Sequence, residues 1–305
     1  MFFKKKKKGQ AILERFNLAD PRAFWQEVFQ PHIGLFSEEE RERLAKACVA
    51  IPGLGGAGGT HLISMVRSGV GRFRLADFDC FEPRNISRQY GARISDLGRP
   101  KVEVMAEEAL NINPHIQIET YPEGINQENI DRFLEGVDVI LDGIEFFSFE
   151  ARRLLYDKAR EKGICVVVAA PLGFSAALLV FHPTKSPSFE EYFGITPEMS
   201  KLEKAIAFAL GLAPKPLFLK YMDLDSLDLK AGRGPASVIA CYLCSALVSM
   251  EAIRIILGRP GLKPVPHYLL FDLYLKKFHL GYLRGGYKNP WQRIKFHLLK
   301  RKLRI

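Results

Sequence analysis

The sequence predicts a doubly wound α/β fold, built on a mainly parallel sheet that antiparallel strands extend near the C-terminus. Three observations predict it. Strand-like and helix-like segments alternate from Cys48 to Ala169. The glycine-rich stretch Val49 to Gly59 joins the first of these strands to a helix. Later, a long apolar helix is followed by two more strand-like runs, Tyr268 to Phe271 and Phe278 to Leu283.

Each element of the first half has a local signature. Asp20 and Pro21 predict the start of a short helix that runs to Phe29. Ser37, with Glu40 three residues later, has the capping-box form that starts a second helix. Alternation then predicts strands at 48–51, 73–77, 116–120, 137–142 and 164–169, with helices after the glycines and over 101–111, 126–134 and 150–161. In such folds ligands bind outside the carboxyl ends of the strands.

The second half is less regular. The uncharged run Gly163 to Phe181 is long enough to raise a membrane helix, but a proline and a glycine divide it, so we predict two buried strands joined by a turn. Prolines interrupt the pattern from His182 to Arg233, which predicts a long crossing segment, either mobile or lying over the site. Pro235 leads the apolar helix, which extends from Ala236 to Leu257.

The glycine-rich stretch has the form of a phosphate-binding turn. Gly53, Gly55 and Gly58 satisfy G-x-G-x-x-G, and Asp77 closes the next strand about 20 residues on. Glycines let the backbone approach phosphate oxygens, and the amides at a helix N-terminus present partial positive charge to them. Glycine-rich turns also close ordinary corners, so the position of the acid is what favours a nucleotide.

Length and composition allow one large core, since 48% of the 305 residues are hydrophobic. We expect the following divisions along the chain: a basic N-terminal tail (1–19), N-terminal helices (20–47), a nucleotide-binding Rossmann-like core (48–181), a crossing segment, helix and C-terminal strands of the same domain (182–283), and a basic C-terminal helix (284–305).

Polar residues after the glycine turn favour ATP over a dinucleotide. They are Asp79, the run Asn85 to Gln89, Lys101 at a helix start, and Asp142 to Glu145 at a strand end. Asparagine, arginine and lysine donors at neighbouring strand ends suit a triphosphate, and carboxylates beside them can hold Mg²⁺. This set suits nucleotidyl transfer better than hydride transfer, which leaves a dinucleotide oxidoreductase as the disfavoured rival.

On these motifs the sequence resembles the adenylyltransferases of the ThiF, MoeB and HesA type, relatives of the ubiquitin-activating enzymes. The resemblance covers Gln26 to Gly258 and rests on an ordered series: GLGGAG, D-F-D at 77–79, N-x-x-R-Q at 85–89, and G-R-P-K ending at Lys101. It implies ATP- and Mg²⁺-dependent adenylylation of a carboxylate, commonly the C-terminal glycine of a ubiquitin-like sulfur carrier, with release of pyrophosphate. It also implies a homodimer.

The resemblance assigns roles to individual residues. Arg88, Lys101 and Glu145 would be catalytic, with Glu145 as the magnesium ligand. The glycines would cradle the phosphates and Asp77 would take the ribose hydroxyls. The full nucleotide-binding set is Gly53, Gly55, Gly56, Gly58, Asp77, Asp79, Asn85, Arg88, Gln89, Lys101 and Asp142.

Two departures from the family pattern lie at functional positions. Where the family has T-D-N, this chain has Ile144-Glu145-Phe146, so a longer carboxylate replaces the metal-binding aspartate. Where the family often has R-Y-x-R-Q, whose arginine reaches into the partner subunit, this chain has AFWQE at 23–27. Arg22 and Arg15 are nearby but out of register. These departures keep open a non-catalytic scaffold of the same fold.

The five cysteines show no disulfide framework, and no signal peptide opens the chain, so we expect a reducing, cytoplasmic setting. Many relatives bind zinc with two C-x-x-C pairs. This chain has one, Cys241 to Cys244, and two ligands cannot close a zinc site, so we predict buried small residues there. No cysteine occurs from Thr184 to Ala240, which predicts that the acyl adenylate passes to an external nucleophile.

Part of the net charge of +10 lies at the two ends, in Lys4 to Lys8 and in the tail from Arg284 to Ile305. Solvated ends are one interpretation, and an electrostatic hold on RNA or an anionic membrane is the other. A tRNA-modifying relative that activates a carboxylate on a threonylcarbamoyl base is therefore a second enzyme hypothesis. In the tail, Trp291, Ile294 and Leu298 share a helix face; we favour packing on the parent fold over membrane binding.

Overall fold

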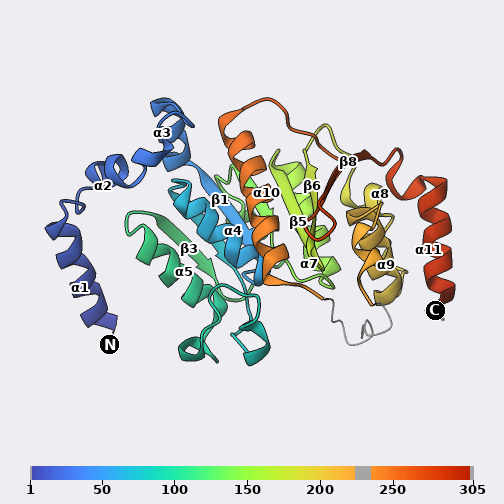
Figure 1. The fold of residues 1–305 in the computed structure, drawn as a ribbon, viewed down its shortest axis with the longest axis horizontal. Helices are drawn as coiled ribbons and strands as arrows, with labels where there is room; N and C mark the ends of the chain where they lie inside the picture. Colours follow the sequence, from blue (N-terminus) through green and yellow to red (C-terminus); the bar gives the residue numbers. More distant parts are fainter. Residues whose placement is uncertain (1, 224–234, 303–305) are drawn as a thin grey trace.

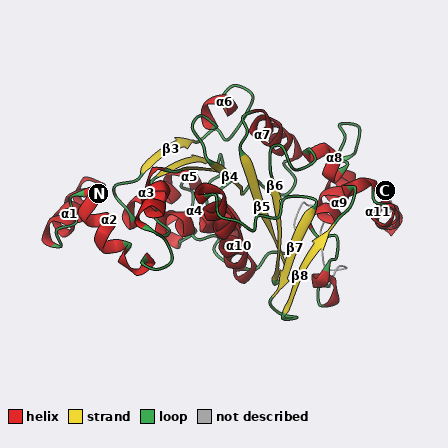
Figure 2. Ribbon diagram, turned by 90° about the horizontal axis from the view of Figure 1, so that it is seen from above, coloured by secondary structure: helices red, strands yellow, loops and turns green. Residues whose placement is uncertain are grey.

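The central strand of the molecule, β1 (Cys48–Pro52), is buried along its whole length. The computed structural model describes residues 2–223 and 235–302. Its strands form one eight-stranded sheet in the order β3-β2-β1-β4-β5-β6-β7-β8 (Figures 1 and 2). The other strands are β2 (Arg72–Ala76), β3 (Gln117–Tyr121), β4 (Val139–Asp142), β5 (Cys165–Leu172), β6 (Ser175–Phe181), β7 (His267–Asp272) and β8 (Lys277–Tyr282).

The strands from β1 to β5 pair in parallel, and β6, β7 and β8 continue the sheet antiparallel. This confirms the predicted fold class, including the C-terminal antiparallel extension. The parallel strands all end at one edge of the sheet, which we call the carboxyl edge. Because β5 and β6 pair as a hairpin, with Leu172 opposite Ser175, the start of β6 lies at that edge too. The uncharged run therefore forms two strands, as predicted.

Helices cover both faces of the sheet (Figure 2). One apolar core lies beneath α4, α5 and α10, and the other lies beneath α6 to α9. The helices are α1 (Phe2–Arg15), α2 (Pro21–Val28), α3 (Glu38–Lys46), α4 (Gly56–Arg67), α5 (Lys101–Ile112), α6 (Ile130–Phe133), α7 (Phe149–Glu161), α8 (Phe189–Phe193), α9 (Lys201–Leu212), α10 (Val238–Leu257) and α11 (Pro290–Lys302).

Helix α10 is long and apolar enough to cross a membrane by length and composition alone. In the fold its inner side packs against β5, β6 and α4, so it serves as a core helix of the sheet. Cys241 and Cys244 lie on that inner side and are buried, as predicted.

The crossing segment contains two helices that its prolines concealed. Helices α8 and α9 both start with capping boxes, Ser188 with Glu191 and Ser200 with Glu203. Their aromatic side chains, among them Phe193 and Phe208, are buried in the core beneath α7. The same signature identified α3 in the sequence, so these helices were within reach of sequence analysis. Residues 224–233 of the segment lie outside the described residues.

Candidate active site

The turn between β1 and α4 is built on glycines because no side chain fits there. Gly53 has a positive φ of 84°, and a Cβ on it would lie 2.2 Å from the carbonyl oxygen of Gly143. A Cβ on Gly58 would lie 1.8 Å from the carbonyl oxygen of Gly53. The first turn of α4 is thus pressed against the end of β4, which fixes the position of its N-terminus.

That N-terminus is open to a ligand. Gly55 is the N-cap of α4 and provides no side-chain cap. Uncapped amides at a helix start attract anions, because the helix dipole adds to their partial positive charge. A Cβ on Gly55 would have Gln89 Nε2 as its nearest neighbour, at 3.7 Å, and one on Gly56 would lie 3.5 Å from the Arg88 carbonyl oxygen. The structure therefore brings Arg88 and Gln89 onto the glycine turn.

Asp77 clamps this turn from the end of β2. Its Oδ2 accepts a hydrogen bond from the Leu54 amide at 2.6 Å, and its Oδ1 accepts one from the Asp79 amide at 2.9 Å. Burial raises the pKa of the Asp77 carboxyl, while the hydrogen bond from Leu54 acts to lower it. Asp77 is therefore a positioning group for the turn as well as the predicted ribose ligand.

Lys101 and Asp79 form an ion pair beside the turn. Lys101 Nζ lies 2.7 Å from Asp79 Oδ2, and the Lys101 amide donates to the Asp79 carbonyl oxygen. The lysine side chain is only 7% exposed whereas the aspartate is 53% exposed. The cation is thus buried, and its carboxylate partner is the group that faces solvent. Asn85 is buried nearby and caps its own loop, since its Oδ1 accepts from the Glu82 amide.

One atom in this group is left without a partner among the described residues. Gln89 is buried, and its Oε1 has no hydrogen bond there. An unpaired buried oxygen costs free energy, so an unsatisfied group of this kind requires an explanation. A nucleotide on the open turn would provide polar groups beside Gln89. The uncapped turn, the buried amide and the buried lysine together fit ATP.

Two carboxylates lie at the end of β4, one buried and one exposed. Asp142 is buried and accepts hydrogen bonds from Arg152 Nε at 2.8 Å, the Tyr156 hydroxyl at 2.9 Å and the Ile144 amide at 3.0 Å. Its carboxylate therefore supports the loop after β4, directly before Gly143, which lies against the glycine turn, and its role as a nucleotide ligand stays a prediction. Glu145 is exposed on that loop, and its Oε2 accepts from the Phe147 amide.

Arg152 and Tyr156 are positioning residues that sequence reasoning missed. Arg152 Nη2 also donates to the Ile144 carbonyl oxygen at 2.6 Å, and its guanidinium lies over the Phe208 ring, 4.6 Å from the centroid. It thereby fixes the loop that carries Glu145. Their spacing along the helix could have revealed them, because Arg152 and Tyr156 lie on the same buried face of α7 as Phe149.

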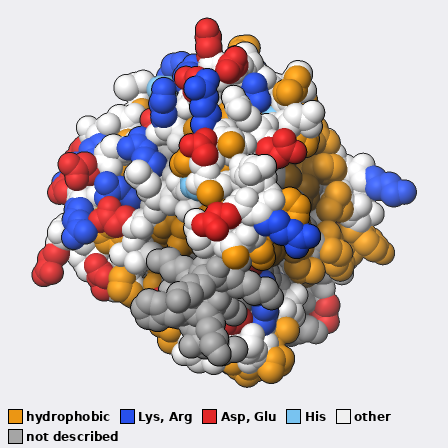
Figure 3. All heavy atoms as spheres, turned by 90° about the vertical axis from the view of Figure 1, so that its left-hand side faces the viewer, with side chains coloured by type: hydrophobic (Ala, Val, Ile, Leu, Met, Phe, Trp, Pro, Cys, Tyr) orange, Lys and Arg blue, Asp and Glu red, His pale blue; other side chains and the backbone are white. Residues whose placement is uncertain are grey.

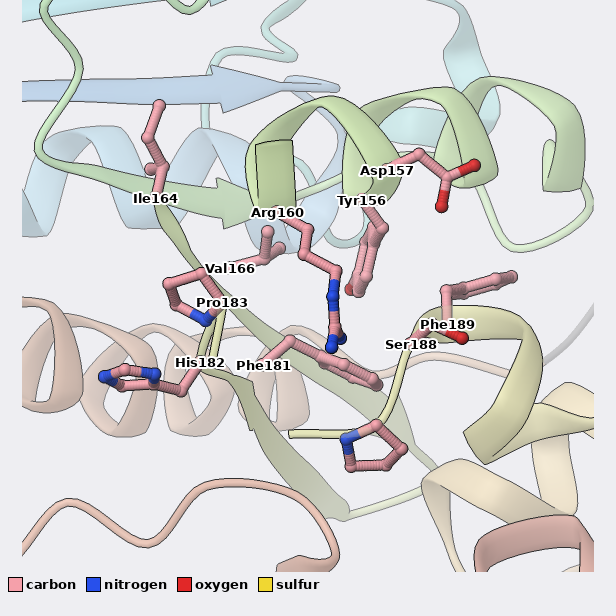
Figure 4. A pocket seen from close by; sticks show the side chains of 11 residues that line it. Tyr156, Asp157, Arg160, Ile164, Val166, Phe181, His182, Pro183, Ser188 and Phe189 are labelled. Carbon is pink, nitrogen blue, oxygen red and sulfur yellow. The ribbon is translucent and has the colours of Figure 1, made fainter. Parts of the chain in front are cut away.

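The cavity in Figure 4 is a separate feature. It lies between α7 and the ends of β6 and α8, lined by Tyr156, Arg160, Val166 and Phe181 among others. Val166 is near the start of β5 and Phe181 ends β6, so this cavity is at the sheet edge opposite the glycine turn. Arg160 Nη1 donates to the Ser186 carbonyl oxygen there. None of the predicted site residues lines it.

The N-terminal helices lie away from the chain's own glycine turn. Gly69, in the loop before β2, has Trp25 and Phe29 as its nearest neighbours, which places the end of α2 at the opposite edge of the sheet. Arg22 is exposed on α2 and Arg15 is exposed at the end of α1. Neither arginine is brought to the site of its own chain.

Comparisons with known proteins agree with this geometry. A model described as the ThiF family matches residues 29–290. The sulfur carrier protein adenylyltransferase of Thermus thermophilus is 31% identical over 250 residues, which are 82% of this chain and 82% of that protein. The tRNA threonylcarbamoyladenosine dehydratase of Haemophilus influenzae is 30% identical over 137 residues, 45% of this chain and 52% of that protein.

Among solved structures, E. coli MccB with MccA superposes with a TM-score of 0.62 at 17% sequence identity. The superposition covers 84% of this chain and 69% of that one. At this identity the likeness shows the fold alone.

Proposed function

The chain belongs to the ThiF family, and from that premise we propose that it uses ATP and Mg²⁺ to adenylate the C-terminal carboxylate of a ubiquitin-like or sulfur-carrier protein. The family and the enzyme class, an ATP-dependent adenylyltransferase, are those that the motifs predict. The observation that carries the proposal is the open glycine turn with Arg88 and Gln89 against it, because this arrangement suits a triphosphate.

In the proposed reaction, a carboxylate oxygen of the substrate attacks the α-phosphorus of ATP. The new bond is the mixed anhydride of the acyl adenylate, the α–β phosphoanhydride breaks, and pyrophosphate leaves. The α4 amides and Arg88 hold the phosphates and stabilise charge that develops on them. Lys101 joins them once a phosphate oxygen replaces Asp79 as its partner.

Glu145 is the residue we propose as the magnesium ligand. The described residues contain no cluster of three or more metal-ligating side chains. Mg²⁺ is usually held by one or two carboxylates together with the substrate's own phosphates, so a single glutamate can serve as its protein ligand. When bound, the ion would neutralise phosphate charge in the transition state. Arg152 aids this by fixing the backbone on both sides of the Ile144–Glu145 bond.

We further propose that the acyl adenylate passes to an external nucleophile. Burial raises the pKa of the Cys241 thiol to about 11, and Cys241 Sγ would lie 2.8 Å from a Cβ on Gly56. A thiol so protonated and so enclosed is a poor nucleophile. The five cysteines are free thiols, which also supports a reducing, cytoplasmic setting for the reaction.

The first test combines unfolding and turnover. We expect ATP with Mg²⁺ to raise the unfolding temperature of the wild type and of Arg67→Ala, a control on the far end of α4, but not of Arg88→Ala. Pyrophosphate exchange into ATP should require a carrier with a free C-terminal carboxylate and should be lost in Glu145→Ala. It should persist in Cys80→Ser, which removes the exposed cysteine of the chain. Exchange without any carboxylate substrate would contradict the proposed reaction, and full exchange in Glu145→Ala would contradict the proposed metal ligand.

A tRNA-modifying activity is the alternative, favoured by the likeness to the Haemophilus influenzae dehydratase and by the basic ends of the chain. It requires tRNA binding that weakens steeply with salt, as phosphate contacts do. Gel-shift titration with tRNA at two salt concentrations separates the two enzymes. Absence of binding removes the alternative. ATP-Mg²⁺ binding without turnover on either substrate would leave the non-catalytic scaffold.

We also propose a homodimer, supported by an apolar surface that one chain leaves exposed. On α10 this surface comprises Val238, Ile239, Tyr242, Ala246 and Met250. Hydrophobic side chains gather at the right of Figure 3, which is the side facing the viewer in Figure 1, where α10 lies.

The hairpin of β7 and β8 continues this surface. Phe278, Leu280 and Tyr282 alternate along β8, so they share one face of the sheet, and all three are exposed. Leu280 pairs with Leu269, which packs on the core that α10 covers, so the hairpin face and α10 lie on the same side. Monomers rarely expose large apolar patches, so this surface supports the proposed dimer interface.

A further inference from the structure

Helix α11 has two faces of different character. Its inner face packs on α9: Gln292 and Phe296 are 4% and 3% exposed, and Lys300 pairs with Glu203 of α9. Lys295 Nζ also donates to the Pro214 carbonyl oxygen at 2.8 Å. In Figure 1 the helix stands at the C-terminal end of the molecule with α9 on its inner side. The helix therefore packs on the parent fold as predicted, but not through the predicted stripe of Trp291, Ile294 and Leu298.

The outward side carries the apolar stripe itself. Trp291, Ile294 and Leu298 are 71%, 48% and 63% exposed. Their spacing of three and four residues aligns them along one side of the helix over two turns. The sequence pattern makes this stripe the natural contact with the parent fold, but the structure uses the other face. An aligned row of large apolar side chains is therefore left in solvent.

The charges around the stripe are all of one sign. Arg293 and Arg301 are exposed beside it. No acidic residue follows Asp272 in the sequence, while lysines and arginines recur through to Arg304. A partner for this surface must therefore accept apolar side chains and carry negative charge.

We propose that the outward face of α11, defined by Trp291, Ile294 and Leu298 with Arg293 and Arg301, docks on the surface of an anionic lipid bilayer. The helix has 13 residues, too few to span a bilayer, so it lies in the interface with the stripe among the acyl chains and the arginines at the headgroups. Tryptophan at one end of the stripe suits that boundary, where an amphipathic ring is favoured.

Two other anionic or apolar partners fit less well. RNA satisfies the charge, but Ile294 and Leu298 can neither stack on bases nor donate hydrogen bonds, so the stripe would be buried without a matching surface. A second copy would satisfy the stripe, but pairing this face with itself would bring arginines of both chains together, which like-charge repulsion opposes.

The test uses the full chain and vesicles of phosphatidylcholine, alone or mixed with phosphatidylglycerol. We expect sedimentation with the mixed vesicles only, weakened by salt. Trp291→Ala/Ile294→Ala/Leu298→Ala should bind about tenfold less tightly or worse. The matched control is Ile33→Ala/Leu35→Ala/Ile94→Ala, which removes three exposed apolar side chains elsewhere and should bind as wild type does. Equal unfolding temperatures of the two triple variants establish that both fold.

A spectroscopic arm reports the contact directly. Trp25 and Trp291 are the two tryptophans of the chain, so Trp25→Phe leaves Trp291 as the reporter. Its emission should shift to shorter wavelength on mixed vesicles and not on neutral ones. Retained binding in the α11 triple variant, loss only on replacing Lys4 to Lys8 with glutamine, or an emission shift with tRNA in place of vesicles would each overturn the proposal.

Discussion

At the scale of the residue, Gly58 and Gly55 serve the glycine turn in different ways. We expect Gly58 to be needed for the turn to fold and Gly55 to be needed for it to bind ATP. Gly58→Ala places a Cβ within 1.8 Å of the Gly53 carbonyl oxygen, so the backbone must shift, and we expect to lose at least about 2 kcal/mol of unfolding free energy. Gly55→Ala meets Gln89 Nε2 at an ordinary 3.7 Å. It should unfold nearly as wild type does but lose stabilisation by ATP-Mg²⁺, because its methyl group occupies the proposed phosphate space.

Urea unfolding of both variants, with and without ATP-Mg²⁺, checks this pair. Equal destabilisation of the two variants, or full ATP stabilisation of Gly55→Ala, would contradict a folding role for Gly58 and a binding role for Gly55.

The same scale shows why sequence analysis finds some site residues and not others. Gly53, Asp77, Arg88 and Lys101 lie in short motifs whose spacing is set by one turn or one loop, so the pattern is local. Arg152 acts through Asp142, on another element, and that pairing exists only once α7 lies across the end of β4. Nothing in the local sequence encodes this pairing, so the motif pattern could not reveal that Arg152 holds the Asp142 carboxylate.

At the scale of the element, α4 contains a buried histidine that gives the fold a pH dependence. His61 is fully buried, both ring nitrogens lack partners among the described residues, and burial lowers its pKa to about 3. Between pH 6.5 and 3 the unfolded chain binds a proton that the folded chain does not, so this group makes stability fall as pH falls through that window. Above the unfolded pKa its contribution is constant.

His61→Leu removes this pH-dependent contribution. We expect the wild type to lose about 2 kcal/mol relative to the variant between pH 7 and pH 5, whatever fixed offset the change in packing adds. Chemical denaturation at several pH values measures the difference, and the baseline is Leu110→Ala, an exposed change on α5 that leaves His61 in place. A wild-type minus variant difference that does not change with pH would mean that His61 is partnered or accessible in the folded protein.

The sequence predicts a helix or strand wherever its hydrophobic periodicity is unbroken. The parallel strands and their helices follow from alternation, which survives whatever the tertiary contacts are. Helices α8 and α9 were concealed because prolines before, between and after them break the window over which periodicity is counted, although their capping boxes are intact. For α11, the apolar stripe identifies the helix but not its packing side. Phe296 and Gln292 are the buried side chains of this helix, and on the same side Lys300 pairs with Glu203 of α9.

At the scale of the whole molecule, the apolar surface of α10 and the β7–β8 hairpin leads to a prediction about assembly. We expect the wild type to elute as a dimer in size-exclusion chromatography with light scattering. Ile239→Glu and Leu280→Glu should each convert it to a monomer, since either change buries a charge in an apolar interface. Ile94→Glu, also at an exposed position, is the control and should remain dimeric.

The dimer requires α10 and the hairpin to act together, and combining the two substitutions tests this. If α10 and the hairpin form one interface, the two glutamate variants reach the same monomeric state and combining them adds little further change. If they serve different contacts, Ile239→Glu alone will dissociate the dimer and Leu280→Glu will not. A wild type that is monomeric at every concentration would contradict the interface altogether. The exposed surface would then need another partner, and ATP-Mg²⁺ stabilisation of that monomer would show that each glycine turn binds its nucleotide without a second chain.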